Sequence, residues 1–217
     1  LNSGNIDLGN TGSATLTISN GGLVTTGSNL VYAYDTGTIT SDGSVRVAIT
    51  SGSTGTINIG AAAASAAAAS GTLQSNKIAF GAGTGTLNFN HTNTNYSLGS
   101  TISGTGTINV LAGTTHLAST STGFTGTMNL DGGLLSLDSG NKLGSANMYI
   151  GNTASKSGTL LIEGSGTELT NTGNFFVGNN GTGDFTLRNA AKASVGNVRI
   201  GNTASSTGNT ALITGNH

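Results

Sequence analysis

Acidic residues are the first candidates for chemistry in this chain. Glycoside hydrolases use two converging carboxylates, and Ca²⁺-dependent lyases use several acids around the ion. The sequence contains eight acids: Asp7, Asp35, Asp42, Asp131, Asp138, Glu163, Glu168 and Asp184. The two that are closest in sequence, Glu163 and Glu168, are five residues apart. A catalytic pair would have to form between distant parts of the chain, so we expect no catalytic residue and no enzymatic activity.

Histidines are the next candidates, as metal ligands. His91 and His116 are 25 residues apart, and neither has a cysteine or an acid at ligand spacing. We therefore expect no metal ion and no other cofactor, and we expect both histidines to lie on solvent-exposed or stacked positions. The Gly-x-Gly pairs, such as Gly83 and Gly85, complete neither a dinucleotide-binding fingerprint nor a P-loop, so nucleotide binding is not indicated.

Basic residues near the C-terminal end give a weaker hint of a binding surface. If neighbouring strands brought Arg188, Lys192 and Arg199 to one face, they would suit an acidic glycan or a matrix protein. The alternative is an ordinary solvated face, because Glu163 and Asp184 lie nearby in sequence. Charged residues are only 7% of the chain and the formal net charge is −1, so we expect no nucleic-acid partner.

Tyrosines give a second hint of binding. Tyr32, Tyr34 and Tyr96 stand in polar stretches, and exposed tyrosine is common at recognition surfaces. The alternative is a structural role in stacked strands. We take Tyr32 and Tyr34, with the three basic residues, as the candidate binding residues.

Composition limits the elements that position these residues. The 217 residues include 37 glycines, no proline and no cysteine, and aromatic residues are 5% of the chain. So few helix formers and large apolar groups make a helical bundle or an ordinary enzyme domain a poor fit, and the lack of cysteine excludes a disulfide scaffold. Apolar residues still reach 35% and recur in alternating pairs, which argues against disorder. The pairs include Leu16/Ile18, Val45/Val47, Ile57/Ile59, Leu87/Phe89, Ile108/Val110 and Phe185/Leu187.

Two motifs repeat along the chain. The hexapeptide Ile150–Ser155 returns unchanged at Ile200–Ser205, 50 residues later. The pattern Gly-Thr-apolar-Asn-apolar begins at Gly55, Gly85, Gly106 and Gly126, at spacings of 30, 21 and 20 residues. A strand signal at this spacing favours the coils of a solenoid over a sandwich or a propeller. We predict an all-β chain that folds as a right-handed parallel β-helix of about ten coils.

Strand alternation predicts which side chains face the core. Apolar residues point inward, while threonine, serine and asparagine point outward, where they can form hydrogen-bonded ladders. The inward residues aligned on successive coils near the C-terminal end are Leu160 and Ile162, then Phe185 and Leu187, then Ala211 and Ile213. The outward residues there are Thr159, Leu161, Thr186 and Arg188.

Residues 51–145 resemble the autotransporter-associated β-strand repeats of bacterial type V secreted passengers. The matching stretches are GTINIGAAAA from Gly55, IAFGAGTGTLNFNH from Ile78, ISGTGTINVLAGTTHL from Ile102 and GFTGTMNLDGGLLSL from Gly123. Residues 1–50 and 146–217 resemble the related Gly-Asn type repeats of the same proteins, and residues 61–69 form an Ala-rich insertion between coils.

The resemblance implies one β-helix over residues 1–217, read as an excerpt of a longer passenger. It also implies export through the outer membrane by a C-terminal translocator β-barrel of the same polypeptide, outside this chain. We expect a non-catalytic adhesin on the bacterial surface, or secreted from it, that contacts a host-cell or extracellular-matrix component. The alternatives are a secreted effector that acts as the ligand of a host receptor and, less favoured, a glycan-active enzyme.

Overall fold

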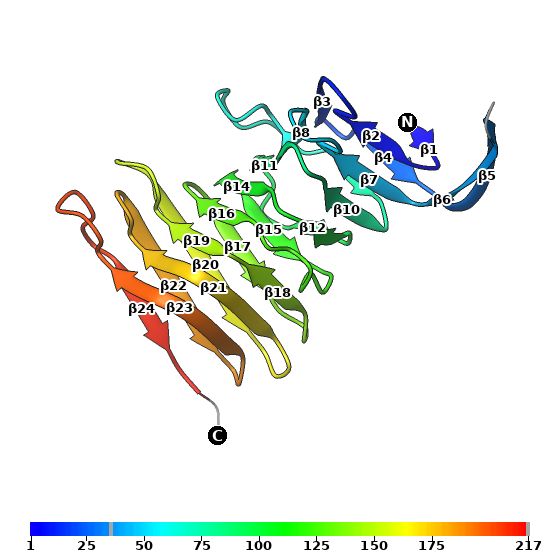
Figure 1. Ribbon diagram of the computed structural model, residues 1–217. Helices are drawn as coiled ribbons and strands as arrows, with labels where there is room; N and C mark the ends of the chain where they lie inside the picture. Colours follow the sequence, from blue (N-terminus) through cyan, green and yellow to red (C-terminus); the bar gives the residue numbers. More distant parts are fainter. Residues whose placement is uncertain (35–36, 216–217) are drawn as a thin grey trace.

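The computed structural model describes the backbone of residues 1–34 and 37–215, and the side chains of residues 1–27 and 41–215. Every regular element of this part is a β-strand, and the strands stack on one another along an elongated body (Figure 1). All strand pairs are parallel except one hairpin. The predicted all-β, parallel β-solenoid fold is confirmed.

Four parallel sheets form the solenoid. The largest has nine strands: β3 (Ser13–Ile18), β8 (Thr54–Gly60), β11 (Thr84–Asn90), β14 (Thr107–Ala112), β16 (Thr127–Leu130), β18 (Lys142–Ser145), β19 (Asn147–Ile150), β21 (Glu168–Val177) and β23 (Lys192–Ile200). A second has six: β12 (Tyr96–Leu98), β15 (Thr114–Leu117), β17 (Leu134–Leu137), β20 (Ser157–Glu163), β22 (Thr182–Arg188) and β24 (Thr210–Ile213).

The other two sheets lie toward the N-terminal end. One contains β2 (Ile6–Leu8), β7 (Ser44–Val47), β10 (Lys77–Phe80) and β13 (Thr101–Ser103), and the other contains β1 (Asn2–Ser3), β4 (Leu23–Thr26) and β9 (Thr72–Gln74). The antiparallel hairpin of β5 (Ser28–Tyr34) and β6 (Gly37–Asp42) leaves the solenoid at this end (Figure 1). The sequence repeats did not predict this hairpin.

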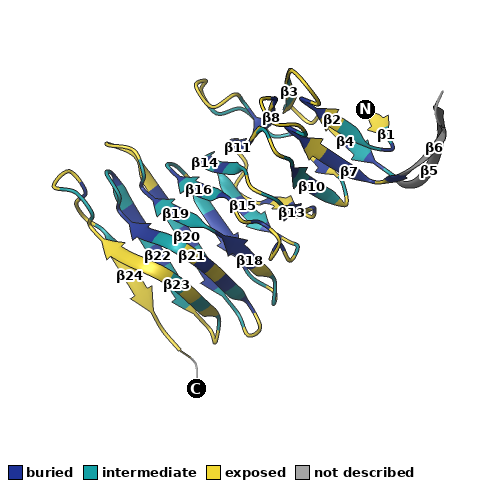
Figure 2. Ribbon diagram, in the orientation of Figure 1, coloured by how far each residue is buried: buried dark blue, intermediate teal, exposed yellow. Residues whose placement is uncertain are grey.

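Aliphatic and aromatic side chains form the core. Buried residues recur along the stacked strands (Figure 2). The register aligns Leu160 with Phe185 and Ala211, and Ile162 with Leu187 and Ile213, as the alternation predicted. Leu160 and Ile162 have no exposed surface. The corresponding residues of β24 are exposed, because no strand of the described chain lies beyond β24.

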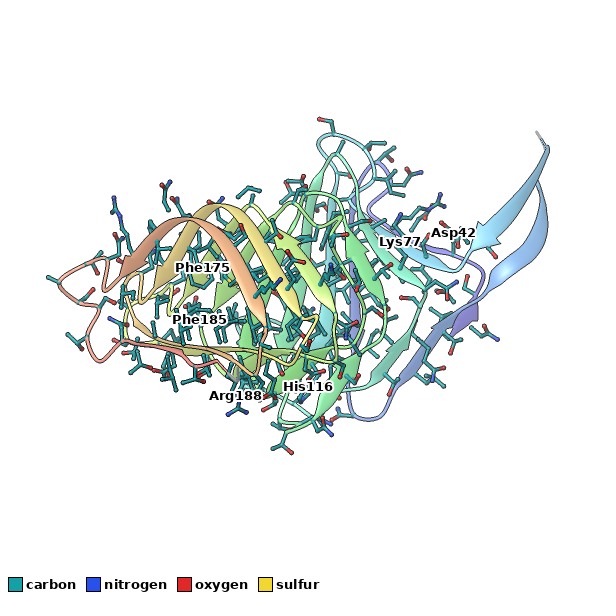
Figure 3. The ribbon with its side chains drawn as sticks, turned by 90° about the horizontal axis from the view of Figure 1, so that it is seen from below. Asp42, Lys77, His116, Phe175, Phe185 and Arg188 are labelled. Carbon is teal, nitrogen blue, oxygen red and sulfur yellow. The ribbon has the colours of Figure 1, made fainter. Side chains whose placement is uncertain are left out.

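The ring of Phe175 packs against Phe185 inside the coil, with 5.1 Å between the ring centroids. Seen from below, these two rings lie among the strands, whereas His116 and Arg188 lie at the margin of the molecule (Figure 3). Polar chemistry in this fold is therefore confined to the outer face and to a few buried positions.

Candidate functional site

Asparagine side chains form a hydrogen-bonded column along the outside of the nine-stranded sheet. Each amide nitrogen donates to the side-chain oxygen on the preceding coil, with N···O distances of 2.7–3.1 Å. The members, which we call the amide ladder, are Thr17, Asn58, Asn88, Asn109, Asn129, Asn152, Asn179 and Asn202. The ladders expected from the sequence are thus present for asparagine.

The register of the strands explains why the ladder changes position at one coil. Asn58, Asn88, Asn109 and Asn129 align directly on β8, β11, β14 and β16. The strand partner of Asn129 is Tyr149, so its amide is bonded instead by Asn152, in the turn that follows β19. The ladder then continues through the equivalent turns of the next coils.

An aromatic stack takes over the strand position that the ladder leaves. Tyr149, Phe176 and Arg199 align on β19, β21 and β23. The rings of Tyr149 and Phe176 meet edge to face at 5.5 Å, and the guanidinium of Arg199 lies 5.3 Å from the centroid of Phe176. The same guanidinium donates a 2.7 Å hydrogen bond to Oδ1 of Asn202, so Arg199 caps the last amide of the ladder.

The three basic candidate residues lie on two strands and have different surroundings. Arg188 ends β22 and lies 2.7 Å from the carboxylate of Glu163 on the neighbouring strand. Lys192 begins β23 beside Glu168, whose carboxylate pairs with Lys142 at 3.1 Å. Arg199 stands seven residues beyond Lys192 on the same strand, which is up to about 23 Å for extended chain.

The tyrosine candidates have different outcomes. Tyr32 and Tyr34 belong to β5, and their side chains lie outside the described residues. Tyr96 has the structural role that the sequence left open as the alternative: it is 6% exposed and packs against Phe89 and His91 in the core. Burial raises the pKa of Tyr96 to about 12. The polar residues that surround Tyr96 in the chain gave no sign of burial. Its side chain is nevertheless buried, because it points to the inner side of β12.

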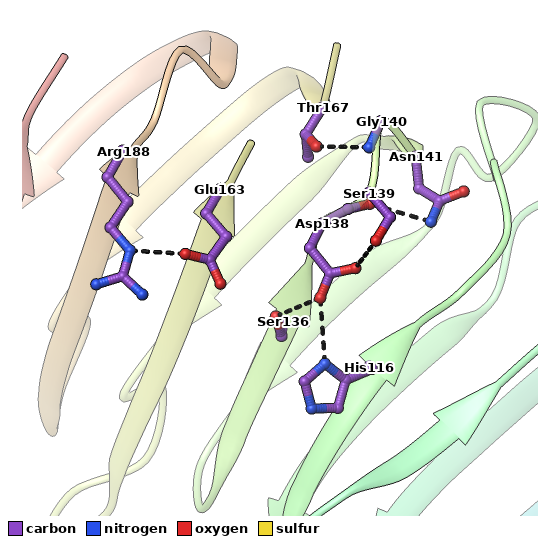
Figure 4. A network of polar contacts seen from close by, with 9 residues as sticks. All are labelled: His116, Ser136, Asp138, Ser139, Gly140, Asn141, Glu163, Thr167 and Arg188. Carbon is purple, nitrogen blue, oxygen red and sulfur yellow. Dashed lines mark hydrogen bonds and ion pairs between the residues drawn. The ribbon is translucent and has the colours of Figure 1, made fainter. Parts of the chain in front are cut away.

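Two carboxylates lie on adjacent coils near the end of the six-stranded sheet (Figure 4). Asp138 follows β17, Glu163 ends β20, and the register of the two strands places these residues side by side. Asp138 lies 3.3 Å from Nδ1 of His116 and accepts hydrogen bonds from Ser136 and Ser139. Because Asp138 is paired with His116 and Glu163 with Arg188, each carboxylate already has a basic partner, and this arrangement suits a structural row of charges better than acid–base catalysis.

His91 occupies a position that corrects the sequence expectation. It has no exposed surface, and its Nε2 atom lies 2.9 Å from Oγ1 of Thr115, itself fully buried. Burial lowers the pKa of His91 below its ordinary value. The residue is neither solvent-exposed nor stacked on His116, which aligns instead with Ser97 and Ser136.

Among the residues with described side chains, no three acidic or histidine groups are close enough to hold a metal ion. The described residues also contain no helix that is long and apolar enough to cross a membrane. No protein-family model, curated protein or solved structure matches the chain.

Proposed function

We propose that this chain is a non-catalytic β-solenoid of a bacterial autotransporter passenger that is exposed at the cell surface or secreted. In this role its outer face contacts a host-cell or matrix component. The observation that carries the proposal is the amide ladder, whose members from Asn109 to Asn202 are partly exposed on the outer side of the nine-stranded sheet. A regular, largely uncharged polar face of this length suits an extended contact surface rather than a single reaction centre.

The surroundings of the acidic groups support the same proposal. Catalysis needs a group whose protonation state and position are set for a substrate. The carboxylate of Asp138 is paired with His116, and that of Glu163 is paired with Arg188. The side chains of His116, Asp138 and Arg188 are each about a third exposed or more. Export fits the composition, because a chain without cysteine forms no disulfide before it crosses the outer membrane.

The test is adhesion by the purified 217-residue chain. Beads coated with the protein are expected to attach to cultured epithelial cells or to a matrix-coated surface, and free protein is expected to compete with them. The matched control is the Leu160→Asp variant, which places a charge in the core and should lose the fold. Equal attachment of both kinds of bead, or none by the folded protein, would contradict the proposal.

Two further readouts separate the alternatives. Receptor phosphorylation triggered by the soluble chain, without attachment, would favour an effector that acts as a ligand. Cleavage of a glycan panel that Asp138→Asn or Glu163→Gln abolishes would favour an enzyme, and would identify the charge row as its site.

A further inference from the structure

Three departures from the repeat meet at one pocket of about 370 Å³ beside the nine-stranded sheet. They are the Ala-rich insertion 61–69, the acid Asp131 after β16, and Lys156 in the turn after β19. The insertion and this turn project from the same edge of the solenoid (Figure 1). In repeat proteins, insertions that interrupt the repeat gather on one face, which is often the binding face.

The Ala-rich insertion is held in place as one wall of the pocket. The side-chain amide of Asn90 donates to the carbonyl oxygens of Ala62 and Ser65, at 2.8 and 2.9 Å. The carbonyl of Asn90 accepts from the backbone of Ala61 at 2.9 Å. Asn90 is 4% exposed, so this anchor is shielded from water and the insertion presents methyl groups in a defined position.

Asp131 presents an oriented carboxylate to the pocket. Its two oxygens accept one hydrogen bond each from Thr153, from the backbone N–H at 2.8 Å and from the hydroxyl at 2.7 Å. A carboxylate has about four lone-pair sites, so each oxygen retains one for a ligand. The carboxylate is therefore fixed in direction but not saturated.

Lys156 is a charge that the second copy of the repeat lacks. The hexapeptide Ile150–Ser155 is followed by Lys156, whereas its copy Ile200–Ser205 is followed by Ser206. The two turns are closed alike, by backbone hydrogen bonds from Lys156 to Thr153 at 3.1 Å and from Ser206 to Thr203 at 3.0 Å.

The side chains of Lys156 and Ser206 differ in burial and in the contacts they make. Ser206 is 9% exposed and bonds the carbonyls of Gly178 and Gly181. Lys156 is exposed and has no acidic partner at ion-pair distance among the residues whose side chains are described. Its charge is therefore not needed to close the turn and remains available to a ligand.

We propose that this pocket binds a carboxylate-bearing sugar at the end of a glycan. The ammonium of Lys156 pairs with the sugar carboxylate, and the carboxylate of Asp131 accepts hydrogen bonds from neighbouring hydroxyls. The side chains of Ala63, Ala67 and Leu111, which also line the pocket, contact the apolar face of the ring. Asn90 ends β11, Leu111 lies near the end of β14 and Asp131 follows β16, so these residues line the pocket over three successive coils, a length of about 10 Å.

This inference rests on the proposed contact function and names the chemistry of its ligand. The test measures binding of the full 217-residue chain by calorimetry to sialyllactose and to digalacturonate, with lactose as the neutral probe. We expect at least one acidic probe to bind and lactose not to bind, and the acidic probe that binds identifies the sugar source.

The variants test the two charged groups separately. Lys156→Ser, which installs the residue of the second copy, should weaken binding at least about tenfold. Asp131→Asn should weaken it by a similar factor. The matched control is Lys77→Ser, because Lys77 is a partly exposed lysine of β10 outside the pocket, and it should change affinity less than about twofold.

Three results would overturn the pocket assignment: equal affinity for lactose and the acidic probes, equal losses in Lys156→Ser and Lys77→Ser, or no binding of either acidic probe at millimolar concentration. Circular dichroism and the melting temperature of each variant verify that the fold is intact. Attachment of protein-coated beads to cells without binding of these probes would leave the proposed adhesion standing and remove only this site.

Discussion

The side-chain amide of Asn88 donates a 2.8 Å hydrogen bond to Oδ1 of Asn58, although 30 residues separate the two in the chain. Both side chains are nearly inaccessible to water, at 3% and 2% exposure, and Oδ1 of Asn88 accepts from Asn109 in turn. Replacing Asn88 by alanine would leave an acceptor and a donor of the ladder without their partner.

We therefore expect Asn88→Ala to lower the free energy of unfolding by about 1–3 kcal/mol, the usual penalty for unsatisfied buried polar groups. Urea unfolding followed by circular dichroism measures it. Asn95→Ala is the matched control, because Asn95 is exposed in the loop before β12, and it should cost less than about 0.5 kcal/mol. Equal effects of the two substitutions would show that the ladder does not contribute to stability.

The core predicts a second, larger effect. Leu160 is fully buried, so Leu160→Ala should lower the free energy of unfolding by about 2–5 kcal/mol through lost burial and the cavity that remains. Thr186→Ser, on the outward side of β22, should change it by less than about 0.5 kcal/mol. If both variants were equally stable, the inward face of these strands would be misassigned.

His91 predicts a dependence of stability on pH. Burial lowers its pKa in the folded state below the unfolded value of 6.5. Between the two pKa values the unfolded chain binds a proton that the folded chain does not, so stability is fully present above about pH 6.5 and falls as the pH drops toward the folded-state pKa.

The measurement is urea unfolding of wild type and His91→Gln at pH 7.5 and pH 5.5. For each protein the change in the free energy of unfolding between the two pH values is determined, and the two changes are compared. The contributions of His116 and the carboxylates cancel, because both proteins contain them. Wild type should lose more stability than the variant on acidification. If His91→Gln does not fold, the NMR titration of the His91 ring in wild type tests the same point, and a titration midpoint at or above its ordinary pKa would refute the prediction.

Two glycines with positive φ provide a test of turn geometry. A β-carbon on Gly151 (φ 67°) would lie 2.2 Å from the carbonyl oxygen of Thr182, whereas one on Gly21 (φ 76°) would meet nothing within 4 Å. Gly21→Ala should therefore cost about 1 kcal/mol, from the left-handed conformation alone. Gly151→Ala adds steric overlap and should cost about 2–4 kcal/mol. Thermal and urea unfolding measure the difference, and equal losses would mean that the coils separate easily at this turn.

The sequence by itself determined the solenoid and most of its core. Alternating pairs such as Leu87/Phe89 and Ile108/Val110 place two apolar groups on one face of a strand, and their recurrence leaves stacked coils as the way to bury them. The asparagine between the members of each pair then faces outward beside its counterpart on the next coil. The sequence alone therefore predicts a ladder at this position.

Only the tertiary structure decided which distant polar residues meet. The turns between strands differ in length, so spacing in the chain does not give the position around the coil. His91 and His116 are about one coil apart in sequence, but His91 forms an isolated bridge with Ala68 after β11 whereas His116 lies in β15, and only His91 is buried. Asp138 and Glu163 become neighbours through the register of β17 and β20.

The pocket lined by the Ala-rich insertion, Asp131 and Lys156 is likewise formed only by the stacking of coils. Its residues come from five successive coils, and the contacts that shape it, such as those of Asn90 with the insertion, are side-chain hydrogen bonds between distant segments. Local alternation specifies which face a residue takes. The stacking of coils, which depends on every intervening turn, specifies what stands beside it.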